Sequence, residues 1–167
     1  MLEIVAGAAL GALATLTVQW WTNRNSATRA ARREMYVELL AMLERALRVW
    51  EPTTLDPDAT IPDVIPDDRI DEFDARVELD ASPEVRDLTR QAFALSQRFN
   101  VSYVMKVPVD VNEHGLFDYR YELVRGVDDD VAKLHRRIGL AGIRGDLRSV
   151  VDQLAAQMRR ELHGKGS

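Results

Sequence analysis

Residues 35–50 read MYVELLAMLERALRVW, and this stretch decides the fold. Its apolar side chains recur every three or four positions, which places them on one face of an α-helix. No glycine or proline interrupts the stretch. The apolar face consists of Met35, Tyr36, Leu39, Leu40, Leu43, Ala46, Leu47 and Trp50. Because such a face must be buried against other elements, the pattern predicts a mainly α fold, an antiparallel helical bundle whose core this helix faces.

The chain before this helix contains an apolar run, Ile4–Trp21, that carries no charge. At about 1.5 Å per residue the run spans roughly 27 Å, close to the thickness of a bilayer's hydrocarbon core. The alternative is an alanine-rich helix packed in a soluble core. Aromatic and basic residues at the end of the run favour the membrane, because both are typical of membrane interfaces. The expected interface residues are Trp20, Trp21, Arg24, Arg29, Arg32 and Arg33.

We therefore expect residues 1–22 to be a transmembrane anchor and residues 23–50 to be a juxtamembrane amphipathic helix. A cleaved signal peptide fits less well, since no lysine or arginine precedes the apolar run. The positive-inside rule then places the arginines and all later residues in the cytoplasm. The expected protein is a single-pass protein of the inner membrane, with the lipid bilayer as its first partner.

Small residues recur within the expected anchor. Gly7 and Gly11 are four positions apart, and Ala14 continues the same helix face one turn later. Small residues at this spacing let two membrane helices approach closely. The three residues are a candidate helix dimer seam, which makes a homodimer one expected assembly.

Composition limits the remaining chain. About 145 residues follow the anchor, which suits one domain better than two. The absence of cysteine excludes disulfides, thiolate catalysis and thiolate metal sites. A net charge of −5 argues against a general nucleic-acid binder, so we expect no specific nucleic-acid partner. Arginine outnumbers lysine nineteen to three, a usage typical of GC-rich bacterial genomes.

Residues 51–67 form an acidic segment with four prolines. Proline ends helical propagation, so the segment predicts an extended loop. The loop is either a binding segment or a flexible connector, and its length favours the connector. The prolines are Pro52, Pro57, Pro62 and Pro66.

Residues 68–163 are expected to form the helical domain, and its first two helices have clear start signals. Asp67 or Asp68 can cap a short helix. Ser82 followed by Pro83 and Glu84 combines a capping hydroxyl, a proline at the first helical position and an acid in the first turn. The short helix presents Ile70, Phe73 and Val77, and the next helix presents Val85, Leu88, Ala92, Leu95 and Phe99.

The periodicity changes over residues 101–124. Apolar residues alternate with other residues from Val101 to Val111 and again from Phe117 to Leu123. Strict alternation around a turn predicts a β-hairpin inserted into the bundle. The competing interpretation extends the preceding helix to about Lys106 and leaves the remaining residues as a loop.

The C-terminal part returns to helical spacing. A short helix is expected to bury Val131, Leu134 and Ile138. Gly139, Gly142 and Gly145 are expected to break the chain before a last helix capped by Asp146. The face of this last helix consists of Leu147, Val150, Val151, Leu154, Met158 and Leu162, and residues 164–167 form a tail.

Four segments carry a resemblance to a group of known proteins. They are Arg29-Ala-Ala-Arg-Arg-Glu-Met-Tyr36, Ala75-Arg-Val-Glu-Leu79, Ala81-Ser-Pro-Glu-Val85 and Met158-Arg-Arg-Glu-Leu162. Together with the N-terminal span, they make the chain resemble small single-span helical membrane proteins of unknown function from GC-rich bacteria and their phages. The resemblance implies a fold and a location, and it carries over no activity and no site residues.

No assembled active site is evident in the sequence. Asp110-x-Asn112-x-His114-Gly115 and Asp56-x-Asp58-x-Thr60 have calcium-loop spacing only at their starts. The three histidines lie far apart and match no metal or catalytic motif. We therefore predict no catalytic, cofactor or metal residues, and a membrane-tethered, non-enzymatic protein that acts by association with an unknown protein partner. The alternatives are a phage- or prophage-type envelope protein, for superinfection exclusion or lysis, and an enzyme with an unrecognised carboxylate site.

Overall fold

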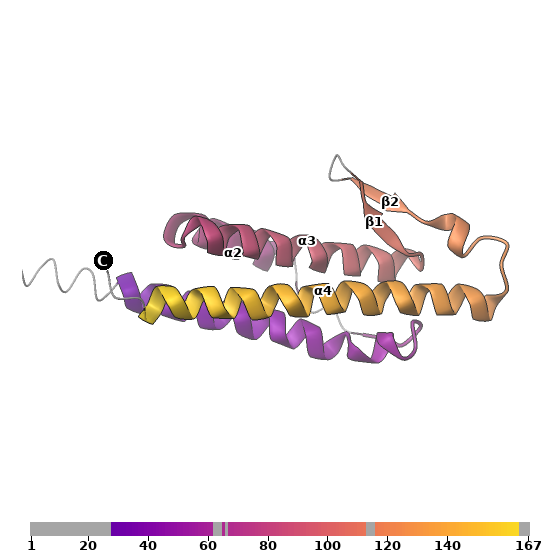
Figure 1. Ribbon diagram of the computed structural model, residues 1–167, viewed down its shortest axis with the longest axis horizontal. Helices are drawn as coiled ribbons and strands as arrows, with labels where there is room; N and C mark the ends of the chain where they lie inside the picture. Colours follow the sequence, from indigo (N-terminus) through magenta and orange to yellow (C-terminus); the bar gives the residue numbers. More distant parts are fainter. Residues whose placement is uncertain (1–27, 62–64, 66, 113–115, 164–167) are drawn as a thin grey trace, which may run out of the picture.

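The computed structural model describes residues 28–61, 65, 67–112 and 116–163 (Figure 1). The chain is mainly helical, as the spacing of its apolar residues predicts. The α-helices cover residues 28–49, α2 (Asp67–Asp80), α3 (Pro83–Met105) and α4 (Asp129–His163). The short elements are the 3₁₀ turns η1 (Glu51–Thr54) and η2 (Tyr121–Leu123) and the strands β1 (Val109–Val111) and β2 (Phe117–Tyr119).

Three long helices form the body of the bundle. α4 runs along its whole length, with α3 and the 28–49 helix beside it, and α2 covers α3 (Figure 1). Tyr36 contacts Glu161 and Glu44 contacts Arg148, so the 28–49 helix and α4 are antiparallel. One end of the bundle, called here the Glu161 end, holds the start of the 28–49 helix and the end of α4. The opposite end, called the hairpin end, holds β1, β2, η2 and the start of α4.

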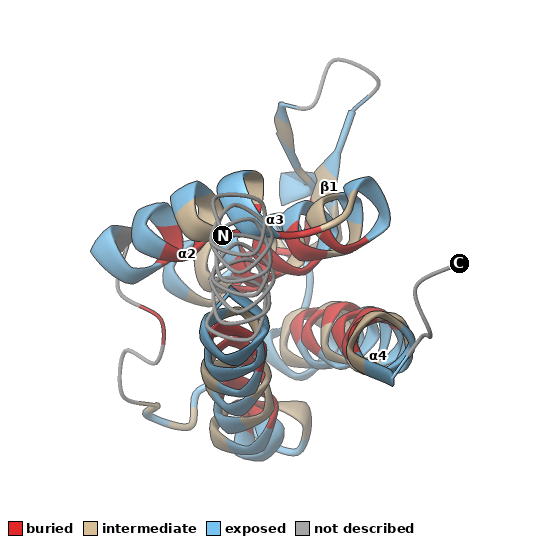
Figure 2. Cartoon of the chain, turned by 90° about the vertical axis from the view of Figure 1, so that its left-hand side faces the viewer, coloured by how far each residue is buried: buried red, intermediate tan, exposed pale blue. Residues whose placement is uncertain are grey.

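The 28–49 helix faces the core as its spacing predicts. Seven of the eight predicted side chains, from Met35 to Trp50, are buried, and Leu40 is half-buried. The Trp50 ring stacks on the Phe99 ring of α3, with the ring centroids 4.0 Å apart. Figure 2 shows the buried faces of the long helices turned toward one another. Burial of each large apolar side chain contributes about 1.5–3 kcal/mol to this packing.

The predicted start of α3 is confirmed. The Ser82 hydroxyl accepts a hydrogen bond from the Val85 N–H at 3.3 Å, and Pro83 is the first helical residue. Small side chains such as Ala92 and Ser96 are buried along α3. The buried hydroxyls of Thr89 and Ser96 donate to carbonyls one turn earlier, each at 2.8 Å. These hydrogen bonds satisfy polar groups that would otherwise be costly to bury.

The predicted strand over residues 101–107 is wrong, because α3 continues to Met105. Helical geometry lets the Ser102 hydroxyl donate to the Val107 carbonyl at 2.8 Å and keeps Phe99 against Trp50. These contacts outweigh the strand preference of the valines, which depends strongly on packing. Lys106 then takes a left-handed conformation with φ of 54° and ends the helix.

A hairpin does follow, but it is shorter than the sequence predicts. β1 pairs with β2 in antiparallel register, with Val109 opposite Tyr119 and Val111 opposite Phe117. The helix-extension interpretation is therefore right up to Met105, and the hairpin interpretation is right for the two strands after it. Tyr121 and Leu123, which continue the alternation in the sequence, belong to η2 instead.

The predicted break at the glycines is wrong. α4 is one helix of 35 residues that contains Gly139, Gly142 and Gly145. An unbroken helix has a single buried face, and that face is set by the long C-terminal stripe, which continues backwards through Leu140 and Arg136. The predicted buried stripe of Val131, Leu134 and Ile138 therefore lies on the exposed side of α4.

The acidic segment is held to the bundle over its described part. Asp58 forms an ion pair with the buried Arg136 of α4 at 2.9 Å. The Tyr103 hydroxyl donates to the Ala59 carbonyl at 3.0 Å and accepts from the Ile61 N–H at 3.3 Å. These contacts join residues 58–61 to α3 and α4.

At the Glu161 end, one carboxylate joins three helices. The Tyr36 hydroxyl donates to Glu161 Oε2 at 2.5 Å, and the Ser82 hydroxyl donates to Glu161 Oε1. Burial, followed by the hydrogen bond to Glu161, raises the pKa of Tyr36 well above its ordinary value. The start of α3, the 28–49 helix and the end of α4 are therefore fixed to one another.

Among the helices of the described ranges, none is both long and apolar enough to cross a membrane. The predicted anchor, residues 1–22, lies outside those ranges.

Candidate functional site at the hairpin end

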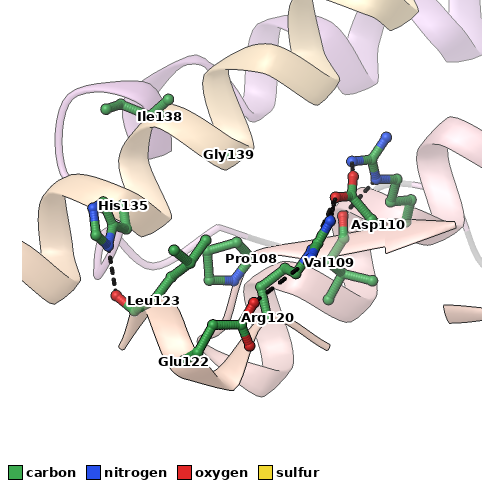
Figure 3. Close-up of a pocket in the computed structure, with 10 residues that line it drawn as sticks. Pro108, Val109, Asp110, Arg120, Glu122, Leu123, His135, Ile138 and Gly139 are labelled. Atoms are coloured by element: carbon green, nitrogen blue, oxygen red, sulfur yellow. Dashed lines mark hydrogen bonds and ion pairs between the residues drawn. The ribbon is translucent and has the colours of Figure 1, made fainter. Parts of the chain in front are cut away.

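A cavity of about 360 Å³ lies at the hairpin end, between the hairpin and the first half of α4 (Figure 3). The end of α3, β1, η2 and α4 all contribute to its walls. Pro108 and Gly139 form its narrow side, since a Cβ added to Gly139 would lie 3.5 Å from the Pro108 Cβ. The cavity is lined by Arg98, Pro108, Val109, Asp110, Arg120, Glu122, Leu123, His135, Ile138 and Gly139.

Asp110 organises the charged wall of this cavity. Arg98 of α3 binds the Asp110 carboxylate and donates from Nε to the Val109 carbonyl at 2.6 Å. Arg120 donates from Nε and Nη2 to the same carboxylate, both at 3.1 Å. The hydrogen bond and charge of Asp110 raise the pKa of Arg120. Asp110 of β1 thus fixes the hairpin to α3 through Arg98, and its contact with Arg120 joins it to the residue that follows β2 (Figure 3).

The carboxylates of this cavity have arginine partners. Asp110 pairs with Arg98 and Arg120, and Glu122 lies 3.6 Å from Arg120. A general acid or base needs a carboxylate that can reach a substrate proton. Asp110 is held by hydrogen bonds from both arginines, so the geometry supports a structural role for this carboxylate.

His135 holds η2 against α4. Its Nδ1 lies 2.5 Å from the Leu123 carbonyl oxygen (Figure 3). A carbonyl can only accept a hydrogen bond, so Nδ1 carries the hydrogen in this contact. The contact fixes the ring orientation and ties the segment after the hairpin to the first turns of α4.

In both segments with calcium-loop starts, an acid pairs with arginine. Asp58 pairs with Arg136, and Asp110 pairs with two arginines. Within the described residues, no three acidic or histidine side chains are grouped as a metal site. Residues 113–115, which include His114, lie outside those residues.

The second feature of the hairpin end is its exposed apolar surface. Of twelve large apolar side chains that are exposed in the described residues, nine belong to residues 104–138, which places the apolar surface at one end of the bundle. We call these nine the hairpin-end patch. It comprises Val104, Met105, Val111, Leu116, Tyr121, Val127, Val131, Leu134 and Ile138.

A second hollow extends this surface on the other side of α4. Its volume is about 410 Å³, and its walls include Leu55, Pro57 and Leu134. Leu55 is itself an exposed apolar residue. The first turns of α4 therefore carry exposed apolar side chains between two hollows. Groups of exposed large apolar side chains are typical of binding surfaces.

The predicted interface residues fall in two groups. Arg29 and Arg33 are exposed on the first turns of the 28–49 helix, and Arg32 is half-buried. Arg32 Nε is buried and has no hydrogen-bond partner within the described structure. The others, Trp20, Trp21 and Arg24, lie outside it, as does the candidate seam of Gly7, Gly11 and Ala14.

Sequence reasoning missed the hairpin-end patch, although a signal for it exists. Leu147 and Leu154 set the buried phase of α4, and stepping back by three or four residues gives Ile143, Leu140 and Arg136. Had this phase been continued through the glycines, the stripe of Val131, Leu134 and Ile138 would have been placed on the outer face. The pairing of Arg98 and Arg120 with Asp110 has no comparable signal, because it depends on where α3 ends.

No protein family, curated protein or solved structure matches this chain.

Proposed function

We propose that this protein is a membrane-tethered, non-enzymatic association protein whose hairpin end docks a protein partner. The observation that carries the proposal is the gathering of exposed apolar side chains in the hairpin-end patch. Large apolar side chains at the centre of an interface supply much of its binding energy. The charged groups around them, such as Asp110 and Arg120, would form a polar rim.

The tether is the second part of the proposal. The uncharged run Ile4–Trp21, followed by arginines, supports a single span of the inner membrane with the bundle in the cytoplasm. In this arrangement the Glu161 end faces the bilayer and the hairpin end faces away from it. The hairpin-end patch would then be accessible to cytoplasmic proteins.

The docking role is tested by affinity purification of the full-length, C-terminally tagged chain from native membranes in mild detergent. The test variant is Val111→Asp combined with Leu116→Asp, two exposed positions of the hairpin-end patch. The matched control is Val37→Asp combined with Leu79→Asp, two exposed apolar positions elsewhere on the bundle. We expect a stoichiometric partner that is lost with the hairpin variant and retained with the control. Equal recovery of the partner with both variants would refute docking through this patch.

The tether is tested separately by washing the same membranes at alkaline pH. A spanning protein stays in the membrane pellet, whereas a protein held only by surface contacts is released. Release of the full chain into the supernatant would refute the span and would leave the docking surface untouched.

A further inference from the structure

The outer face of α4 has coiled-coil spacing. Val131, Leu134, Ile138, Ala141 and Gly145 follow one another at intervals of three, four, three and four residues, and all five are exposed. The opposite face carries the buried Leu140 and Leu147. Alternation of three and four is the pattern by which one helix packs along another. We call these five residues the α4 seam, which covers roughly 21 Å of helix.

Two of the three glycines of α4, Gly142 and Gly145, are not explained by contacts within the described chain. A Cβ added to Gly142 or Gly145 would meet no atom within 4 Å. Glycine is nevertheless less favourable than alanine in a helix interior. Glycine on an outer face allows a second helix backbone to come close, and in the α4 seam it lies next to large apolar side chains that a second helix would cover.

We propose that the α4 seam binds the α4 seam of a second copy of this chain, with the two helices parallel. In heptad terms, Val131 and Ile138 occupy a positions and Leu134 occupies a d position. β-branched residues at a and leucine at d favour parallel two-stranded packing. Leu134 would pack against Leu134 of the second copy, and the backbones would come closest near Ala141 and Gly145. The dimer would then cover Val131, Leu134 and Ile138 and leave the other six residues of the hairpin-end patch for the protein partner.

The charges that flank the seam favour the parallel arrangement. In a parallel pair, Asp130 at a g position lies across from His135 of the second copy at an e position, and Arg137 lies across from an uncharged glycine. Neither contact joins like charges. In an antiparallel pair centred on the same seam, Arg137 would face Arg137 of the second copy, which is a like-charge contact.

The direction of the chain also favours a parallel pair. The 28–49 helix begins at the Glu161 end, so the residues that precede it leave from that end. If both anchors insert into one bilayer, both bundles must present this end to the same side, which a parallel pair does. This step rests on the proposed function. It also makes the α4 seam compatible with a second contact through Gly7, Gly11 and Ala14.

The absence of cysteine allows a clean cross-linking test in native membranes. Single variants Val131→Cys and Gly145→Cys of the full chain are oxidised and analysed without reductant. In a parallel dimer each position faces itself, so both variants should give a disulfide-linked dimer. In an antiparallel dimer centred on the seam, each position would lie more than about 10 Å from itself along the axis, and neither would cross-link. Val37→Cys is the control, because Val37 is an exposed valine like Val131 but lies on the 28–49 helix.

A second variant tests the interface without cysteine at the seam. Ile138→Asp should raise the dissociation constant of the full-length dimer in detergent on the order of tenfold or more, whereas Val37→Asp should leave it unchanged. Cross-linking at both seam positions, together with sensitivity to Ile138→Asp, would support the proposal. Cross-linking no stronger than that of Val37→Cys would overturn it, even if the protein stays in the alkaline-washed pellet and still captures its partner. Release from the pellet with cross-linking intact would instead refute the tether alone.

Discussion

At the Glu161 end, a single carboxylate accepts hydrogen bonds from Tyr36 and Ser82 and joins three helices, and Val37 and Leu79 are the exposed large apolar residues near them in the described sequence. At the hairpin end, Asp110 also joins two partners, Arg98 and Arg120. The neighbouring Val109 is buried, but the nine side chains of the hairpin-end patch remain in solvent. The same kind of polar contact therefore occurs at an end with few exposed apolar side chains and at an end with many. The difference is the basis of the proposal that the Glu161 end maintains the fold and that the hairpin end binds a partner.

The largest expected change in the free energy of unfolding comes from a buried apolar residue of α4, in contrast to an exposed one. Leu154 is fully buried, whereas Ile138 is 60% exposed. Leu154→Ala should lower the free energy of unfolding by about 2–5 kcal/mol, because it removes buried surface and leaves a cavity. Ile138→Ala should change it by less than about 0.5 kcal/mol. Thermal unfolding of the full chain in detergent, at a concentration below dimer formation, measures both. Equal losses of unfolding free energy would contradict the exposure of the outer face of α4.

The next effect concerns the hydroxyl of Tyr36. Tyr36→Phe removes one hydrogen bond to Glu161 and should cost about 1–2 kcal/mol near neutral pH, because bonds to charged groups are the stronger ones. Unfolding of the full chain in detergent, followed by circular dichroism, measures this cost. A variant as stable as the parent would show that Ser82 alone holds the Glu161 end together.

The same residue predicts a pH dependence. The folded protein raises the pKa of Tyr36 above the ordinary value of about 10, so the folded state keeps a proton that the unfolded state loses. The hydroxyl's contribution is therefore complete below about pH 10 and declines as the pH rises further. The parent chain should lose more stability than Tyr36→Phe between about pH 9 and pH 11. The free energy of unfolding of both proteins is measured across this pH range. Equal losses in the two proteins would contradict the predicted direction of the pH dependence.

A gain of about 1 kcal/mol is expected from Gly142→Ala. The added methyl group meets no neighbour, and alanine is the better helix former by about that amount. The measurement is best made in an Ile138→Asp background, in which the proposed dimer is weakened. A loss of stability there would mean that the outer face of α4 has an intrachain contact that its exposure does not indicate.

The smallest effect on global stability is expected at the hairpin. Asp110→Asn weakens the contacts with Arg98 and Arg120, which are partly exposed, and should cost no more than about 1 kcal/mol. Its local effect should be larger, because the strands are only three residues long. Amide hydrogen exchange should accelerate in β1 and β2 and remain unchanged in the 28–49 helix. Faster exchange throughout the bundle would contradict this separation.

Much of the architecture can be predicted from the sequence where local and global signals agree. The stripe from Met35 to Trp50 and the cap formed by Ser82 and Pro83 are confirmed because each depends on neighbouring residues. The end of α3 is harder to predict, since Tyr103 fits the alternation of a strand as well as the spacing of a helix. There the contact of Phe99 with Trp50, far away in the sequence, favours the helix.

The candidate site could be predicted less well than the fold. The glycines of α4 suggest a break when each is considered alone, but helical hydrogen bonds and the buried face on both sides of them maintain one helix. That one difference reverses the expected burial of Val131, Leu134 and Ile138. The charged wall around Asp110 also depends on tertiary placement, because Arg98 and Arg120 approach it from two different elements.

The length of the unbroken α4 also sets the distance between the two ends of the bundle. Its 35 residues, at about 1.5 Å each, make a rod of roughly 50 Å between the Glu161 end and the hairpin end. If residues 1–22 are held in a bilayer as proposed, α4 acts as a rigid spacer that carries the hairpin-end patch up to that height above the lipid headgroups. A partner could then be reached without touching the membrane, and shortening α4 by whole turns would bring the meeting point closer to the surface.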